Sequence, residues 1–331
     1  MKVCCPNCFN DKFLIDRIIR LSKEKGLCDY CESDNVEIIE VNLLQDKFEE
    51  LFELYEENYE GLLLSELVND DWKMFNIEKY ASNNLLSDIL DIEEVLTKKY
   101  INSIDKTSSD EWDKFKDELK YRNRYFLDNS KFNKNDLKDI SQNLENYDYP
   151  DYVYRARICK NNEIIPNERM GKPPSGLQTQ GRANPIGISY LYVASDEKTA
   201  VSEIRPHKGD KITISKIKLP LTLRFFDIRS PKNTISPFNY SDNVLEALYK
   251  DIDLLERFGE ELSKPVLPRE AGIEYLSSQY LSELIKHWGF DGMLYKSSVG
   301  DGFNIVIFSD FELEFIESKL YTIDNLTIKF S

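Results

Sequence analysis

The stretch YLYVASDEKTAVSEIRPH, residues 190–207, contains a strand signal followed directly by a helix signal. Residues 189–194 form a short run rich in aromatic and aliphatic residues, and this run predicts a β-strand. Asp196 then precedes a short apolar run and is predicted to cap a helix that covers Thr199–Arg205. A strand that leads directly into a short helix is typical of a mixed α/β domain. It also places a carboxylate, Glu203, near the end of that helix.

Working outward, similar signals surround this stretch. Alternating or apolar runs predict strands at Tyr152–Ile158, Ile212–Leu219, Leu223–Ile228 and Asn304–Phe308, and helical periodicity predicts helices at Asn243–Glu256 and Tyr275–Trp288. Beyond residue 150 lie 11 of the 13 glycines and 10 of the 12 prolines. Because both residue types mark turns and disfavour helix interiors, the last 180 or so residues are predicted to be turn-rich and mixed.

The first 150 residues differ from this half. Apolar residues recur at three- and four-residue steps between Val41 and Tyr59, which predicts an amphipathic helix with an acidic outer face. Comparable patterns follow, and we expect a helical module over residues 41–148. The predicted fold class is α+β, with a zinc ribbon at residues 1–40, the acidic helical module, and a C-terminal mixed α/β domain at residues 149–331.

Charge limits the classes of partner. The formal net charge is −16, and residues 32–150 carry 30 acidic against 14 basic residues. This balance argues against nucleic acid as a partner, since phosphate-binding surfaces need clustered Lys and Arg. The acidic segment is read as a solvated face, with a surface for a basic partner or for self-association as the alternative. No apolar run is long enough for a membrane span and no signal peptide is evident, so a cytoplasmic protein is expected.

Five of the six cysteines lie within residues 4–31. Cys5 and Cys8 form one CxxC pair and Cys28 and Cys31 form a second. This arrangement is typical of a zinc ribbon, in which four thiolates hold a structural Zn²⁺ ion in a closed tetrahedral site. Disulfides or free thiols are the alternative, and Cys4 is an alternative ligand to Cys5.

Several segments of the C-terminal half together resemble the RES domain family, named for Arg, Glu and Ser. They are YRARI from Tyr154, PPSG from Pro173, GRANPIG from Gly181, the stretch at residues 190–207, SSQYLSELIKHWGFDG from Ser277, YKSS from Tyr295 and NIVIF from Asn304. The resemblance covers roughly residues 150–310. It implies a fold similar to ADP-ribosyltransferases and an activity on NAD⁺. Some family members consume NAD⁺ as toxins that a partner antitoxin neutralises, and others transfer ADP-ribose to a protein.

The resemblance also implies a set of site residues, and their chemistry suits NAD⁺. Breaking the nicotinamide–ribose bond creates an oxocarbenium-like centre, which the Glu203 carboxylate could stabilise. Planar guanidinium groups bind pyrophosphate well, and Arg182 and Arg155 are the candidates. The remaining candidates are Tyr192 to stack on nicotinamide or position the ribose, Asn184 to brace the loop or contact NAD⁺, and Ser297 to hydrogen-bond the substrate, with Ser298 as the alternative serine.

The expected function is cleavage of NAD⁺ by a glycohydrolase or phosphorylase that acts as a growth-arresting toxin or defence effector. The alternatives are a mono-ADP-ribosyltransferase that modifies a protein and a non-enzymatic zinc-ribbon adaptor. Expected partners are NAD⁺, an antitoxin or regulatory protein, and a second copy in a homodimer. Two departures from the family pattern bear on substrate handling: Ala183 follows Arg182 where many relatives have tryptophan, and Ala156 follows Arg155 where some carry an aromatic residue.

Overall fold

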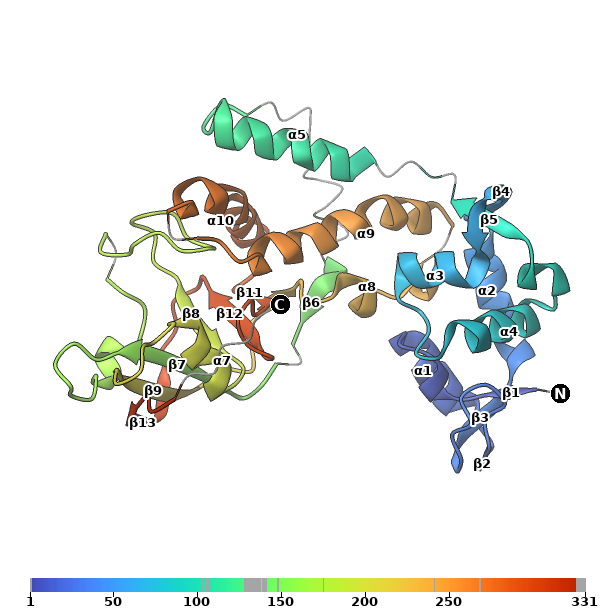
Figure 1. The fold of residues 1–331 in the computed structure, drawn as a ribbon, viewed down its shortest axis with the longest axis horizontal. Helices are drawn as coiled ribbons and strands as arrows, with labels where there is room; N and C mark the ends of the chain where they lie inside the picture. The colour runs from blue at the N-terminus through green and yellow to red at the C-terminus, as the bar shows by residue number, and fades with distance from the viewer. Residues whose placement is uncertain are drawn as a thin grey trace. The chain divides into compact units, whose positions relative to one another are not determined.

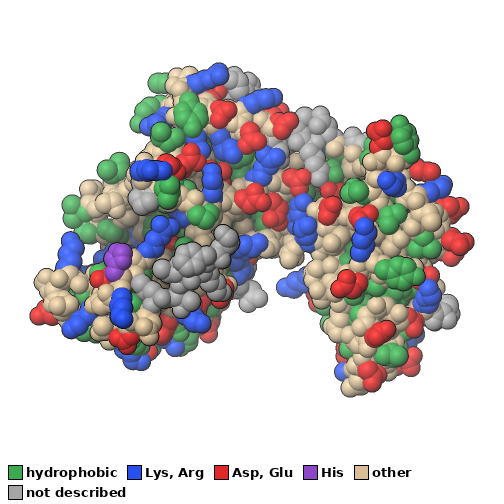
Figure 2. All heavy atoms as spheres, viewed as in Figure 1, with side chains coloured by type: hydrophobic (Ala, Val, Ile, Leu, Met, Phe, Trp, Pro, Cys, Tyr) green, Lys and Arg blue, Asp and Glu red, His purple; other side chains and the backbone are tan. Residues whose placement is uncertain are grey.

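The computed structural model describes residues 2–102, 104, 107–127, 138, 142–147, 149–174, 176–240, 242–267 and 269–325. The chain divides into two compact units. Unit 1 contains residues 1–110 and 230–254, and unit 2 contains residues 111–229 and 255–331. The division falls inside the long helix α9 (Asp242–Ser263). Figure 2 shows Lys, Arg, Asp and Glu side chains interspersed over the visible surface.

Unit 1 begins with a three-stranded antiparallel sheet whose strand order is β1-β3-β2, formed by β1 (Val3–Cys4), β3 (Val36–Glu40) and β2 (Glu24–Gly26). The Asp11 side chain caps α1 by accepting a hydrogen bond from the Leu14 N–H at 2.9 Å. The other elements of this unit are α1 (Lys12–Leu21), α2 (Gln45–Phe52), β4 (Tyr55–Leu63), α3 (Leu64–Trp72), α4 (Lys79–Leu90), β5 (Lys99–Asn102), α8 (Pro231–Thr234) and 3₁₀ turns at Pro6–Cys8, Val41–Leu44, Glu93–Leu96 and Pro237–Asn239.

The helix predicted through Tyr59 ends earlier. The structure has a 3₁₀ turn and then α2, which ends at Phe52, and β4 follows directly. Strand β4 pairs with β5, and Gly61 lies so close to the backbone carbonyl of Tyr100 that a Cβ atom would collide with it. The cross-strand pairing thus overrides the helical spacing, because helical periodicity cannot show that a distant strand is available. The boundary predicted at residue 148 lies outside the described residues.

Unit 2 is built on an eight-stranded mixed sheet with the order β13-β9-β7-β8-β12-β11-β10-β6 (Figure 1). Every neighbouring pair is antiparallel except β10 and β11, which are parallel. Its strands are β6 (Glu145–Asn146), β7 (Tyr152–Ile158), β8 (Leu191–Ala194), β9 (Lys211–Lys218), β10 (Phe225–Asp227), β11 (Gly292–Lys296), β12 (Phe303–Ile307) and β13 (Glu314–Thr322). The predicted α+β class, with its C-terminal mixed sheet, is therefore confirmed.

Among the described residues of this unit, the sheet is accompanied by α5 (Thr107–Tyr121), α7 (Glu197–Glu203) and α10 (Ala271–His287), together with the end of α9 and 3₁₀ turns at Gln142–Leu144 and Asn167–Arg169. The predicted cap of α7 is confirmed, since Asp196 accepts a hydrogen bond from the Thr199 N–H at 2.8 Å. Helix α7 packs against β7 and β8. Strand β13, whose charged sequence gave no apolar signal, was not predicted. Within the described residues, no helix has both the length and the apolar character needed to cross a bilayer.

Candidate functional site: a cavity beside α7

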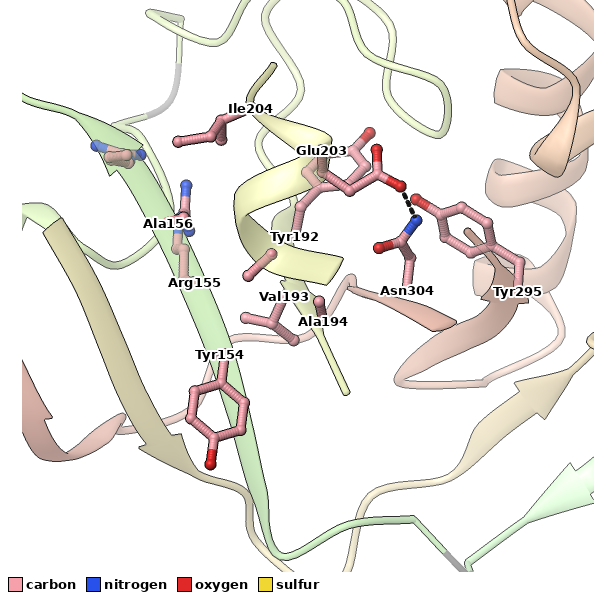
Figure 3. Close-up of a pocket in the computed structure, with 12 residues that line it drawn as sticks. Tyr154, Arg155, Ala156, Tyr192, Val193, Ala194, Glu203, Ile204, Tyr295 and Asn304 are labelled. Atoms are coloured by element: carbon pink, nitrogen blue, oxygen red, sulfur yellow. Dashed lines mark hydrogen bonds between the residues drawn. The ribbon is translucent and has the colours of Figure 1, made fainter. Parts of the chain in front are cut away.

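A cavity of about 310 Å³ opens where β7 and β8 separate. These two strands pair only at Tyr154 and Ala194, so the space beyond that pair is left between them. Small side chains on β7 and α7, Ala156 and Ala200, help to keep it open. Glu203, the last residue of α7, is half-buried in its wall. We call this space the Glu203 cavity (Figure 3).

Two side chains hold the Glu203 carboxylate. The Ser297 hydroxyl donates a hydrogen bond to Glu203 Oε1 at 2.7 Å, and the Asn304 amide donates to the same oxygen at 2.6 Å. Ser297 Oγ itself accepts hydrogen bonds from the Val299 and Gly300 N–H groups at 3.2 and 3.0 Å. The turn after β11 therefore fixes Ser297, and Ser297 fixes one oxygen of the carboxylate.

Tyr192 lines the same cavity, but its hydroxyl is engaged elsewhere. It donates to Asn184 Oδ1 at 2.7 Å and accepts from the Ala183 N–H at 3.0 Å. Asn184 is fully buried and its amide donates to three backbone carbonyls, so it braces the loop and does not line the cavity. A Cβ atom on Gly181 would lie 2.7 Å from the Tyr192 hydroxyl, which explains why glycine occupies this position. Burial raises the pKa of Tyr192, so the phenol is neutral.

Arg182 lies next to the cavity lining rather than in it. Its guanidinium donates to the backbone carbonyls of Leu262 and Lys264 and, at 3.1 Å, to the Ser298 hydroxyl. The two adjacent serines therefore have separate partners, because Ser297 contacts Glu203 and Ser298 contacts Arg182. Ser297 and Ser298 therefore link the two predicted site residues, the carboxylate of Glu203 and the guanidinium of Arg182.

Arg155 is a buried charged side chain at the site that lacks hydrogen-bond partners among the described residues. Its side chain on β7 lines the cavity and is 9% exposed, and its Nη1 atom is buried with no hydrogen-bond partner among the described residues. Burial lowers the pKa of the guanidinium to about 9, and the positive charge of Arg157 adds to the effect. A buried cation without a counter-ion is costly, and a bound anion would offset that cost.

Sequence reasoning thus placed Glu203, Tyr192 and Arg155 around one cavity, with Ser297 in contact with the carboxylate. It missed the other lining residues, and three of these bear on the chemistry. Asn304 and Tyr295 come from β12 and β11, and Figure 3 shows both pointing toward Glu203. Arg157 follows Arg155 by two positions on β7, and the alternating pattern of a strand could have indicated it. Burial raises the pKa of Tyr295 well above its usual value, so its phenol is neutral as well.

A profile of the RES domain family matches residues 153–326. This range includes every residue that lines the Glu203 cavity and more than half of the chain. The chain belongs to the RES domain family. Its RES domain therefore covers β7 to β13 and lies mostly in unit 2.

Among solved structures, the chain is similar to the M. tuberculosis MbcT–MbcA toxin–antitoxin complex. The similarity has 13% sequence identity and a TM-score of 0.35, and it covers 56% of this chain and 92% of that chain. The curated proteins give no match.

A separate cluster lies outside the RES domain, in unit 1. The Sγ atoms of Cys5, Cys8, Cys28 and Cys31 all lie within 4.8 Å of one another. Cys5 and Cys31 are 3.3 Å apart and Cys8 and Cys28 are 3.4 Å apart. Tetrahedral zinc with Zn–S distances of about 2.3 Å requires sulfur separations of roughly 3.8 Å, so this donor set fits a zinc ion.

Cys4 is also buried but does not belong to this four-sulfur group. Burial, and then the neighbouring cysteines, raise the pKa of its thiol. The geometry favours Cys5 over Cys4 as the fourth ligand.

Proposed function

We propose that this RES domain cleaves the nicotinamide–ribose bond of NAD⁺, with Glu203 as the catalytic carboxylate. The observation that carries the proposal is the fixed position of Glu203. One of its oxygens accepts hydrogen bonds from Ser297 and Asn304, in a cavity where Arg155 Nη1 has no hydrogen-bond partner among the described residues. Family membership supports NAD⁺ as the substrate, since the RES domains described above act on it.

The chemistry requires a negative charge beside the ribose. When the bond between ribose C1′ and the pyridinium nitrogen breaks, the bonding electron pair leaves with nicotinamide and the ribose becomes oxocarbenium-like. A carboxylate that is already oriented stabilises this positive charge without reorganising in the transition state. Ser297 and Asn304 engage Oε1, which leaves Oε2 to face the ribose.

The acceptor oxygen then bonds to C1′. With water as acceptor, the products are ADP-ribose, nicotinamide and one proton. With phosphate as acceptor, the product is ADP-ribose phosphorylated at C1′ of the ribose that carried nicotinamide. With a protein side chain as acceptor, the product is an ADP-ribosylated protein. Nicotinamide leaves in both reactions. Arg155 lies where it would pair with a phosphate of NAD⁺, and the Tyr192 ring supplies an apolar wall for nicotinamide.

We further propose that the protein is a growth-arresting toxin or defence effector, with an antitoxin or regulatory protein as partner. The four cysteines would hold a structural Zn²⁺ ion in unit 1. In this proposal the RES domain performs the chemistry, and the N-terminal half regulates it or mediates dimerisation.

Incubation of the purified protein with NAD⁺, followed by separation of the products, tests the proposal. Wild type should release nicotinamide, and the partner product identifies the acceptor when phosphate is included or omitted. Glu203→Gln should lower kcat by about 10³-fold, because removing one preorganised electrostatic group costs about that much. Glu197→Gln is the matched control, since Glu197 is exposed in the first turn of the same helix.

Release of nicotinamide by wild type together with equal rates for the two variants would remove Glu203 from the mechanism. Absence of any NAD⁺ turnover by folded wild type would reject the proposed activity. Label from NAD⁺ that remains bound to protein would favour the transferase over the hydrolase or phosphorylase.

A further inference from the structure

A second cavity adjoins the Glu203 cavity. It measures about 670 Å³, and the two cavities share Arg157 and Ile204 in their linings. Its other lining residues come from the end of β7 and the loop that follows, including Lys160 and Arg169. We call it the cationic cavity, defined by Arg157, Lys160 and Arg169.

The charge of this cavity is unbalanced. Arg157, Lys160 and Arg169 line it together with a single carboxylate, Glu163. Arg157 donates only to backbone carbonyls, to that of Arg169 at 2.7 Å and to that of Gly171 at 3.4 Å. In the part of the chain that the structure describes, none of the three cations forms an ion pair.

The cations form a continuous line with the catalytic site. Arg169 contributes to lowering the pKa of Arg157, after burial, and Arg157 does the same for Arg155. Arg155 lines the inner cavity, Arg157 lines both and Arg169 lines the outer one, and each neighbouring pair of guanidinium groups repels. An extended ligand with more than one negative charge would relieve this repulsion.

The cationic cavity also has an apolar side. Ile158 and Ile164 line it and are 41% and 47% exposed, so their side chains present apolar surface next to the cations. A bare inorganic anion gains nothing from such a wall, whereas a nucleoside would pack its base against it.

Hydrogen bonds attach the loop that lines the cationic cavity to the sheet. Thr213 on β9 is fully buried, and its hydroxyl accepts a hydrogen bond from the Ile165 N–H at 2.9 Å. Ser318 on β13 donates to Asn167 Oδ1 at 2.6 Å. The loop is thus attached to the sheet on both sides of Pro166, and the cavity is held open without a ligand.

We infer that the cationic cavity binds the phosphate and adenosine half of the dinucleotide while the nicotinamide half occupies the Glu203 cavity. The inner cavity lies near the lower end of the range for ligand sites, roughly 300–1,000 Å³. The Glu203 cavity is large enough for one half of a dinucleotide, and the adjoining cationic cavity can hold the other half. The identity of the ligand as half of NAD⁺ rests on the proposed function. Free inorganic phosphate carries the same kind of negative charge and is the alternative ligand for the three cations.

Calorimetric titration of the full-length protein with ADP, and separately with inorganic phosphate, tests the inference. Arg169→Ala should weaken ADP binding about tenfold, as expected for loss of one charge-assisted contact. The variant should fold normally, because Arg169 is exposed and Arg157 contacts only its backbone carbonyl. Lys218→Ala is the control, since Lys218 is an exposed cation at the end of β9 that lines neither cavity.

Binding of ADP that depends on Arg169 supports the dinucleotide. Binding of inorganic phosphate that depends on Arg169, without ADP binding, supports a phosphate site but overturns the assignment of the adenosine half. Equal affinities for wild type and Arg169→Ala overturn the whole inference.

A parallel measurement of NAD⁺ turnover separates this inference from the proposed function. If NAD⁺ is cleaved with the same KM in Arg169→Ala, the cavity assignment fails and the activity stands. If ADP binds through Arg169 but NAD⁺ is not cleaved, the activity fails and the nucleotide site stands.

Discussion

The four-cysteine cluster and the Glu203 cavity are built in opposite ways. The cluster takes all its groups from residues 5–31, in two pairs with short spacing. The cavity takes its groups from β7, β8, α7, β11 and β12, with Arg155 and Asn304 almost 150 residues apart. Local spacing is therefore sufficient to predict the first site, whereas the second depends on the pairing of distant strands.

The electrostatics of the two sites differ as well. The cluster contains four donors that would all bind one cation. The cavity contains one carboxylate with one oxygen held by two hydrogen bonds, and an arginine that forms no ion pair with any residue the structure describes. We expect the first site to stabilise the fold and the second to carry a cost that substrate binding offsets.

The largest effect is expected at the cluster. Cys28→Ser should abolish binding of one equivalent of zinc and make residues 2–44 sensitive to protease, since structural zinc sites contribute on the order of 10 kcal/mol to folding. Metal content by mass spectrometry under native conditions measures the first effect, and limited proteolysis measures the second.

Two other cysteines serve as controls for this experiment. Cys4→Ser and Cys159→Ser should both retain the metal, because neither thiol belongs to the four-sulfur group. Loss of zinc from Cys4→Ser, with retention in Cys5→Ser, would show that the ligand assignment is wrong.

An intermediate effect is expected for the groups that orient Glu203. Ser297→Ala and Asn304→Ala should each lower kcat about tenfold, as expected for a hydrogen bond to a charged group, with little change in KM. Steady-state kinetics with NAD⁺ would measure both constants. A rise in KM at unchanged kcat would contradict the positioning role and would instead indicate direct contact with the substrate.

The smallest effect is expected for stability at Arg155. Arg155→Met should raise the free energy of unfolding by about 1 kcal/mol, because it removes a buried, unpaired charge, and it should raise KM for NAD⁺. Chemical denaturation measures the first effect, and steady-state kinetics with NAD⁺ measures the second. The exposed Arg269→Met is the control. A loss of stability in Arg155→Met would show that the guanidinium supports the fold rather than the ligand.

The gain in Arg155→Met should depend on pH in a defined direction. The pKa of Arg155 is lowered to about 9 from its ordinary value of 12.5, so between these values the unfolded chain binds more protons. The cost of the buried charge is therefore fully present below about pH 9 and decreases as the pH rises above it. Denaturation curves at pH 7.5 and pH 10 would compare the two proteins, and a gain that grows with pH would contradict this explanation.

By itself, the sequence determined the features that depend on neighbouring residues. Two CxxC pairs predicted the cysteine cluster, Asp196 predicted the start of α7, and alternation predicted β7 over its full length. These signals arise from local hydrogen bonding and side-chain periodicity, which act over a few residues. The ordered motifs of the RES family added Glu203, Arg155 and Tyr192 as members of one site.

Only the tertiary structure decided which side chains complete that site. The separation of β7 from β8 opens the cavity, the β11–β12 turn brings Ser297 to Glu203, and β12 brings Asn304 to the same oxygen. The same pairing engages the Tyr192 hydroxyl with Asn184 and directs Arg182 toward Ser298. Such contacts join residues far apart in the chain, and their geometry is fixed by strand register and packing, which no local pattern contains.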